Sequence, residues 1–179
     1  PLRRQRQMCI RDSSTTYYRY QDGNLTESFT TDSAGSYSYV QDISSRHHIF
    51  IVENMTTIYI QPDGTVYSDI DLPVPISKSE VGGIYTYTFT SNIYEPIIVQ
   101  RDNIVIDGNG YTLEGPGSGY GFYLIRISNV TLKNVTIKGW TTGIVLWYFS
   151  SYNSISGNNI TNNYYGIFLG ASSYNSISG

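Results

Sequence analysis

Gly121-Phe122-Tyr123-Leu124 returns as Gly143-Ile144-Val145-Leu146 and again as Gly166-Ile167-Phe168-Leu169, at offsets of 22 and 23 residues. The segment Ser151–Gly157 also reappears intact as Ser173–Gly179. A fixed period of this length indicates a solenoid, in which each repeat forms one coil that packs against the next coil.

Two further sets of apolar residues recur once per coil and form columns along the solenoid. They indicate which kind of solenoid the chain forms. Each coil has three short apolar stretches separated by Gly, Asn and Ser, without the L-x-x-L-x-L-x-x-N pattern of a leucine-rich repeat. We therefore predict an all-β fold whose main part is a parallel β-helix with 22–26 residues per coil, right-handed by the crossover rule. Asn and Gly should supply left-handed backbone at the corners. The columns predicted to stack inside are Ile106, Leu132, Ile155 and Ile177; Ile137 and Ile160; and Leu124, Leu146 and Leu169.

The composition agrees with an all-β chain. The 179 residues include 22 Ile and 10 Val but only 2 Ala, together with 18 Tyr and 17 Gly. Helix formers are scarce, which excludes a helical bundle and a doubly wound α/β fold. The longest apolar run, Ile144–Phe149, is far below the roughly 18 residues that a membrane helix needs.

Residues 1–13 differ from the rest of the chain. Residues 3–13 resemble a conceptual translation of a transposase-type sequencing adapter, and they hold the only Cys. The alternative is a basic tail that binds nucleic acid. We predict that residues 1–13 are an adapter artefact and poorly packed. Without them the chain has 7 basic and 13 acidic residues, a net charge of −6, which does not favour nucleic-acid binding.

Three segments follow. Residues 14–53 read as short strands, with a hairpin turn at Asp22-Gly23, and Thr30–Tyr37 resembles the end of an immunoglobulin-like module. We predict the tail of a truncated, partial β-sandwich there. Residues 54–100 are predicted to be a β lead-in or N-terminal cap, with strands at Thr57–Ile60 and Tyr85–Thr90. Residues 101–179 are the predicted β-helix, truncated at its C-terminal end.

The segment Asp102–Leu113 and the Asn-rich coils that follow resemble the right-handed β-helix family that includes NosD-type proteins. This family lies in the pectin-lyase-like superfamily of carbohydrate-binding and sugar-hydrolysis β-helices. Thr57–Asn109 also resembles the entry segment of archaeal cell-surface β-helix proteins, so the resemblance covers about residues 57–179. It implies the fold and an extracellular or cell-surface location. It leaves the activity open, because the fold carries lyases, hydrolases, epimerases, adhesins and spacers.

The residues that catalysis needs are missing from the coils. All 13 carboxylates that follow residue 13 lie between Asp22 and Glu114, and the only charged residues in 115–179 are Arg126, Lys133 and Lys138. Glycoside hydrolysis needs two facing carboxylates, and a pectate-lyase-like site needs clustered acidic Ca²⁺ ligands. We predict no catalytic residue in this chain.

Two groups could suggest a metal. Asp102, Asp107 and Glu114 could form a small Ca²⁺ site, although Asp107-Gly108-Asn109-Gly110 reads more simply as a coil-corner turn. The resemblance to NosD-like proteins implies a copper association, so the only histidines, His47 and His48, have to be weighed. Adjacent strand residues point to opposite faces, and copper favours several imidazoles or soft ligands. We predict neither a metal site nor a cofactor.

Aromatic residues on the coils are the candidates for ligand binding. Tyr123 and Phe168 lie in the middle of the Gly-φ-x-Leu motif, where side chains should point outward, and four more aromatics lie near corners. Exposed aromatic rows can hold sugar rings or partner surfaces, although they can equally stabilise the solenoid by stacking. Tyr152 and Tyr174, 22 residues apart, should stack. The candidate ligand-binding residues are Tyr123, Trp140, Tyr152, Tyr164, Phe168 and Tyr174.

The sequence therefore predicts a non-catalytic structural or binding module of a modular secreted or cell-surface protein, with polysaccharide or surface glycan as partner. The alternative is a polysaccharide lyase or glycoside hydrolase whose catalytic coils lie beyond Gly179. Five Asn-x-Ser/Thr sequons permit glycosylation outside the cytoplasm, although a chain rich in Asn, Ser and Thr also forms sequons by chance. They begin at Asn24, Asn54, Asn129, Asn134 and Asn159.

Overall fold

The computed structural model describes residues 3–9, 16–21, 24–32, 36–42, 49–52, 56–69 and 73–179, and every regular element in these ranges is a β-strand. The chain divides into two compact units, Pro1–Met55 and Thr56–Gly179. Within the described residues, no helix is long and apolar enough to span a membrane.

The first unit contains two antiparallel sheets. One sheet has the order β3-β2-β5, formed by Asn24–Thr30, Thr16–Gln21 and Ile49–Val52. In it Arg19 pairs with Glu27 across β2 and β3, both in register and through a 2.8 Å ion pair. The prediction of short strands in residues 14–53 is confirmed for these segments. The predicted turn at Asp22-Gly23 lies outside the described residues, as do His47 and His48.

The second sheet of this unit pairs β1 (Arg3–Cys9) with β4 (Ser36–Asp42) over the full length of β1. Backbone pairing with a strand edge needs no apolar periodicity, because the N–H and C=O groups make the bonds. This pairing is a property of the backbone, and both the poor packing predicted for residues 1–13 and their origin stay predictions.

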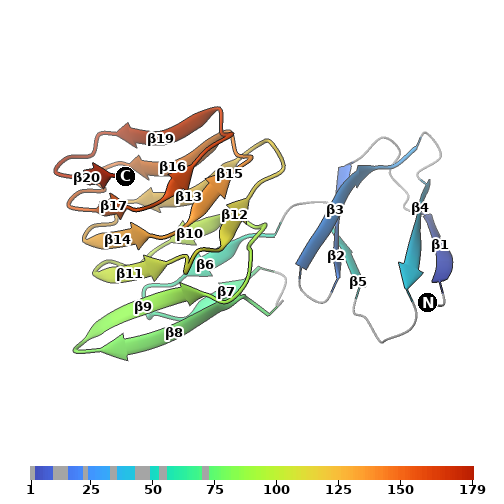
Figure 1. Cartoon of the computed structure of the whole chain (residues 1–179), viewed down its shortest axis with the longest axis horizontal. Helices are drawn as coiled ribbons and strands as arrows, with labels where there is room; N and C mark the ends of the chain where they lie inside the picture. Colours follow the sequence, from blue (N-terminus) through green and yellow to red (C-terminus); the bar gives the residue numbers. More distant parts are fainter. Residues whose placement is uncertain are drawn as a thin grey trace. The chain divides into compact units, whose positions relative to one another are not determined.

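The second unit is built from three sheets (Figure 1). Sheet 1 has the order β7-β6-β10-β13-β16-β19, sheet 2 the order β8-β9-β11-β14-β17-β20, and sheet 3 the order β12-β15-β18. The strands of sheet 1, in this order, are Val66–Ser68, Ile58–Ile60, Ile97–Val99, Tyr120–Ile125, Thr142–Trp147 and Tyr165–Gly170. Those of sheet 2 are Ile76–Val81, Ile84–Phe89, Ile104–Asp107, Val130–Lys133, Ser154–Ser156 and Ser176–Ser178. Those of sheet 3 are Thr112–Glu114, Thr136–Lys138 and Asn159–Ile160.

The chain visits the three sheets in turn, which confirms the predicted parallel β-helix. β10, β11 and β12 form one coil, and β13, β14 and β15 lie parallel beside them in the next coil. The solenoid has about 4 turns. β6 already pairs in parallel with β10, and β9 with β11. Sheets 1 and 2 therefore begin before the repeated part of the sequence.

The interior columns are confirmed by the strand register. Ile106 pairs with Leu132, Leu132 with Ile155, and Ile155 with Ile177, one coil apart each time. The columns Leu124, Leu146, Leu169 and Ile137, Ile160 also align. Leu169 and Ile177 lie on β19 and β20, the outermost strands of sheets 1 and 2, and are 42% and 50% exposed.

The first glycine of the repeat motif is explained by how closely the coils approach. A Cβ on Gly121 would meet the carbonyl oxygen of Gly143 at 2.5 Å, and one on Gly143 would meet that of Gly166 at 2.7 Å. Backbone atoms cannot move aside without breaking the coil, so a side chain is excluded here.

Asparagine side chains connect the corners of successive coils. Asn153 accepts a hydrogen bond from the Val130 backbone N–H at 2.9 Å and donates one to the Ile127 carbonyl at 3.0 Å. Asn158 and Asn163 bond the backbone of the preceding coil in the same two ways. Other corners use left-handed backbone as predicted, at Asn103, Asn109, Asn129, Asn134 and Asn162.

Candidate functional site

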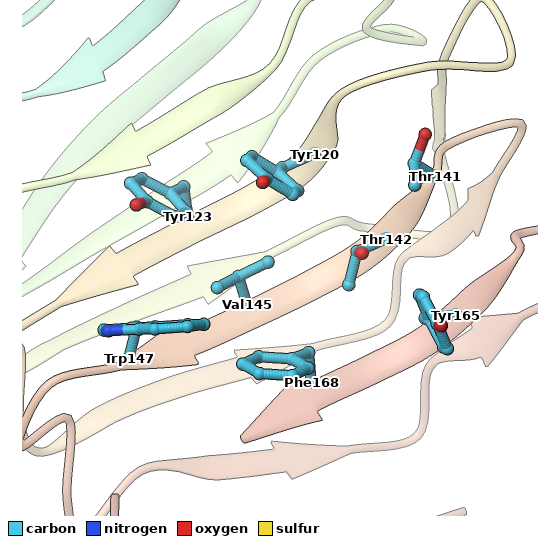
Figure 2. A pocket seen from close by; sticks show the side chains of 8 residues that line it. All are labelled: Tyr120, Tyr123, Thr141, Thr142, Val145, Trp147, Tyr165 and Phe168. Atoms are coloured by element: carbon cyan, nitrogen blue, oxygen red, sulfur yellow. The ribbon is translucent and has the colours of Figure 1, made fainter. Parts of the chain in front are cut away.

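A groove lies on the outer face of sheet 1 (Figure 2). Its volume is about 370 Å³, within the size range of small-molecule sites. Its lining comes from β13, β16 and β19, which are neighbours in sheet 1, and from Thr141, which precedes β16. None of the lining residues is charged. The residues are Tyr120, Tyr123, Thr141, Thr142, Val145, Trp147, Tyr165 and Phe168.

The groove follows from a mismatch between neighbouring coils. Along one outward column the register brings Tyr123 beside Val145 and Val145 beside Phe168. The column next to it has the same pattern, because Thr142 lies between Tyr120 and Tyr165. A small side chain on β16 is thus flanked by large rings on both sides, and the rings stand above it as walls.

The rings of each wall stack on one another. Tyr120 and Tyr123 lie 5.3 Å apart with planes 8° from parallel, and Trp147 and Phe168 lie 5.0 Å apart at 17°. Trp147 pairs in register with Gly170, where a Cβ would meet the Phe168 ring at 2.9 Å. The glycine therefore leaves the space in which Phe168 packs on Trp147.

The walls are partly exposed, whereas the floor is shielded. Phe168 and Trp147 are 37% and 38% exposed, while Val145 is 3% exposed although it lies on the outer face. Beyond Trp147 the aromatic surface continues into Tyr148 and Phe149, which are exposed and have left-handed φ angles of 50° and 64°. Such backbone is unfavourable for bulky residues and is enriched at functional sites.

Of the six predicted ligand-binding residues, Tyr123 and Phe168 lie in this groove. Trp140 does not face outward, and its expected position is wrong. It is only 2% exposed, and its indole N–H donates to the Leu113 carbonyl at 3.3 Å. Gly115 leaves the space for it, since a Cβ there would lie 2.3 Å from the Trp140 ring.

The other three predicted aromatics are exposed at corners and do not line the groove. Tyr152 and Tyr174 stack at 5.0 Å and 8°, which confirms the predicted pair. Tyr164 packs edge-on against Tyr165, with ring centroids 4.6 Å apart. Whether these three contact a ligand stays a prediction.

Sequence reasoning missed most of the groove. Tyr120, Thr142 and Tyr165 each precede the first glycine of the repeat motif, so a third outward column was visible at offsets of 22 and 23 residues. Val145 was visible as the small residue between Tyr123 and Phe168. Trp147 had no such signal, because its place in the wall depends on how Phe168 leans toward it.

The acidic residues near the start of the β-helix each bind different partners. Asp102 accepts the Ser128 backbone N–H at 2.7 Å, and Glu114 pairs with Lys138 at 3.0 Å. Asp107 accepts the Asn109 N–H at 2.9 Å, as in the predicted turn, and pairs with Lys133 at 3.2 Å. Burial alone would raise the pKa of Asp107, but its hydrogen bonds and the Lys133 charge outweigh burial and lower it.

Glu95 is a titratable group that sequence reasoning did not single out. It is 6% exposed and accepts the Tyr94 backbone N–H at 3.1 Å. Burial raises the pKa of this carboxyl to about 7, despite the opposing backbone hydrogen bonds. The carboxyl does not line the aromatic groove.

Comparison with known proteins identifies a family. The model of a family described as periplasmic copper-binding protein (NosD) matches residues 76–179, which is more than half of the chain. Searches of the curated proteins and of the solved structures find no significant match.

The donor set of the matched segment does not fit copper. Residues 76–179 contain no His, Cys or Met, the imidazole and soft sulfur ligands that copper sites use. Among the residues that the structure describes, no three His, Cys, Asp or Glu side chains come together as a metal site. Two acids of the segment, Asp107 and Glu114, are paired with lysines. We therefore derive no chemistry through copper.

Proposed function

This chain belongs to the NosD family of β-helix proteins, and on that premise we propose that it is a non-catalytic module of the cell envelope that binds polysaccharide. The observation that carries the proposal is the aromatic groove on the outer face of sheet 1. The β-helix provides a rigid support on which ring positions are fixed by strand register rather than by loops.

The groove offers the two kinds of contact that sugars use. Aromatic faces pack against the C–H groups of pyranose rings, and Trp147, Phe168 and the tyrosines provide such faces. Hydroxyl groups can donate and accept hydrogen bonds with the sugar edge, and Thr141, Thr142 and the tyrosines carry them. The lining is thus suited to a polyhydroxylated ring.

The non-catalytic part of the proposal rests on the residue types. General acid–base chemistry needs a positioned titratable pair, and residues 115–179 contain no Asp, Glu or His. Tyrosine and threonine hydroxyls remain in the groove, but none of the residues that line it is a base that could take a proton from them.

An envelope location is supported by the family description, which is periplasmic. Polysaccharide is present at the cell surface and in the periplasm, and a sugar-binding solenoid would meet its ligand in either place. Adhesion through the same groove would be a consequence of glycan binding and is part of this proposal.

A glycan array probed with the full chain, with and without Ca²⁺, tests the proposed function. We expect binding that is lost in the double variant Tyr123→Ala, Phe168→Ala. The matched control is Tyr59→Ala, Tyr67→Ala, which removes a stacked pair with rings 5.1 Å apart outside the groove. Loss of binding in both double variants, or in neither, would contradict the assignment to the groove.

A degradation screen against the same glycans tests the other half. We expect no turnover of uronans or neutral glycans. Any turnover that persists in purified protein would favour a lyase or hydrolase instead.

A further inference from the structure

Three of the five Asn-x-Ser/Thr sequons have side chains that the structure describes, and all three have the form Asn-x-Thr. They are Asn129-Val130-Thr131, Asn134-Val135-Thr136 and Asn159-Ile160-Thr161. Because the motif is the same in each, only their places in the fold distinguish them. We infer that the fold selects Asn159 among them as the attachment site for an N-linked oligosaccharide, on the outer face of sheet 3.

The backbone of the Asn159 sequon is extended, whereas the other two Asn residues lie at coil corners. Asn129 and Asn134 have left-handed φ angles of 57° and 56°, and Asn159 does not have a left-handed φ. Asn159 and Ile160 form β18, and Ile160 belongs to an interior column. Since alternate residues of an extended chain point to the same side, Asn159 and Thr161 both lie on the outer face.

The side-chain amide of Asn159 has no hydrogen bond, which distinguishes it from the other two amides that the structure describes in sequons. Asn129 Nδ2 donates to Asn103 Oδ1 at 3.1 Å, and Asn134 Nδ2 donates to Asp107 Oδ1 at 3.1 Å. Each of these bonds has to open before the amide can enter a transferase, which costs free energy. The Asn159 side chain is exposed and has no such bond to open.

The hydroxyl that completes the motif is most accessible in the same sequon. Thr131 and Thr136 are half-buried, whereas Thr161 is exposed. A transferase recognises this hydroxyl together with the amide of the motif. Asn159 and Thr161 thus present both parts of the motif to solvent on one face.

The neighbouring side chains leave room for the first sugar. Thr136 lies in register beside Asn159 on the preceding coil, and Thr112 lies beside Thr136 one coil further. This outward column therefore has short, hydroxyl-bearing side chains and no aromatic ring. The aromatic groove belongs to sheet 1, so an oligosaccharide on Asn159 would be attached to a different sheet.

Attachment is a transfer reaction whose donor is an oligosaccharide linked to a polyprenyl lipid through pyrophosphate. The Asn159 amide nitrogen forms a bond to C1 of the first sugar, the bond between C1 and the pyrophosphate oxygen breaks, and the lipid pyrophosphate leaves. The amide nitrogen gives up one proton and keeps the other. Such transfer is typical of secreted proteins, so it requires the envelope location of the proposed function but does not require the groove to bind sugar.

Enzymatic transfer to the folded chain is the test. The full chain, from a host without N-glycosylation, is incubated with the lipid-linked oligosaccharide and a purified single-subunit oligosaccharyltransferase that accepts Asn-x-Thr. Peptide mass spectrometry then gives the occupancy of each site. At early times we expect the occupancy of Asn159 to exceed that of Asn129 and of Asn134 at least about tenfold. Equal occupancy, or a preference for Asn129 or Asn134, would overturn the assignment.

Synthetic peptides that span the three sequons are the matched control, since they carry the same motifs without the fold. We expect the three peptides to be modified at rates within about threefold of one another. If the Asn159 peptide is preferred as strongly as Asn159 in the folded chain, local sequence selects the site and the fold does not. Modified peptides together with an unmodified Asn159 in the folded chain would also overturn the assignment.

Two substitutions of Thr161 establish that transfer reads this motif. Thr161→Ala removes the hydroxyl and should abolish transfer to Asn159, whereas Thr161→Ser keeps a hydroxyl and should retain transfer. Both should leave Tm nearly unchanged because the position is exposed. Transfer that persists in Thr161→Ala would contradict attachment through the sequon. None of these outcomes affects the proposed function, and a glycan array without binding would leave the assignment of Asn159 standing.

Discussion

Val145 and Leu146 are neighbours on β16, yet they belong to regions that follow different rules. Leu146 points inward, where Leu124 and Leu169 flank it with side chains of the same size. Val145 points outward, where Tyr123 and Phe168 flank it with much larger rings. The interior is close-packed, so a difference in size within one column, such as Phe122 beside Ile144, has to be compensated by the neighbouring columns. The outer face has no such requirement, so a local mismatch can create a groove without disturbing the coil.

The largest expected effect comes from the interior. Leu146→Ala should lower the free energy of unfolding by about 2–5 kcal/mol, because the cavity cannot close within a stacked column. Val145→Ala should cost less than about 1.5 kcal/mol, since the flanking rings can move into the space it leaves. Urea denaturation of the two variants measures the difference. Equal losses would mean that the two faces are packed alike.

Glu95 is an exception to the apolar interior, and its effect depends on pH. Because burial raises its pKa from 4.5 to about 7, the folded protein keeps a proton that the unfolded chain releases in this range. Its contribution to stability should therefore be present below about pH 4.5, fall as the pH rises to about 7, and then stay constant. The change amounts to roughly 3 kcal/mol at most.

Thermal melts of the wild type and Glu95→Gln between pH 4.5 and 8 isolate this contribution. The amide has no charge to bury, so the variant should lose the part of the pH dependence that Glu95 causes. A pH dependence that is identical in the two proteins would show that the carboxyl is solvated in the folded state.

The corners differ from both faces, because hydrogen bonds hold them together. Asn153→Ala should cost about 1–3 kcal/mol, since it leaves the Val130 N–H and the Ile127 carbonyl buried without their partner. Asn159→Ala, at an exposed position of β18, should cost less than about 0.5 kcal/mol. Denaturant unfolding of both variants is the measurement, and a larger loss in Asn159→Ala would contradict the account.

The smallest expected effect lies on the exposed surface. Tyr174→Ala removes the ring stacked on Tyr152 and should cost about 0.5–1.5 kcal/mol. Alanine keeps the left-handed φ of 57° and its strain, so the change in stability reports the lost stacking. A double-mutant cycle with Tyr152→Ala gives the coupling, and a coupling near zero would mean that the stack does not stabilise the coil.

The interior was predictable because its rule is simple. Ile106, Leu132 and Ile155 recur at the coil period, and residues one period apart lie beside one another on adjacent coils of a solenoid. The outer aromatics obey the same period, so Tyr123 and Phe168 were placed correctly. What the sequence did not reveal is contact between coils at other positions. Trp140 is buried because Gly115 on the preceding coil leaves room for its ring, which no column of apolar residues signals.

Tryptophan fluorescence tests the central claim most directly, because the chain has 2 Trp, one buried at Trp140 and one in the groove at Trp147. Acrylamide quenching of the full chain is measured with and without a saturating concentration of a glycan that binds in the array, and again for Trp147→Phe. The account predicts that the sugar protects the wild-type emission from quenching and leaves the variant's emission unchanged. Sugar binding, established by titration, that leaves wild-type quenching unaltered would contradict it.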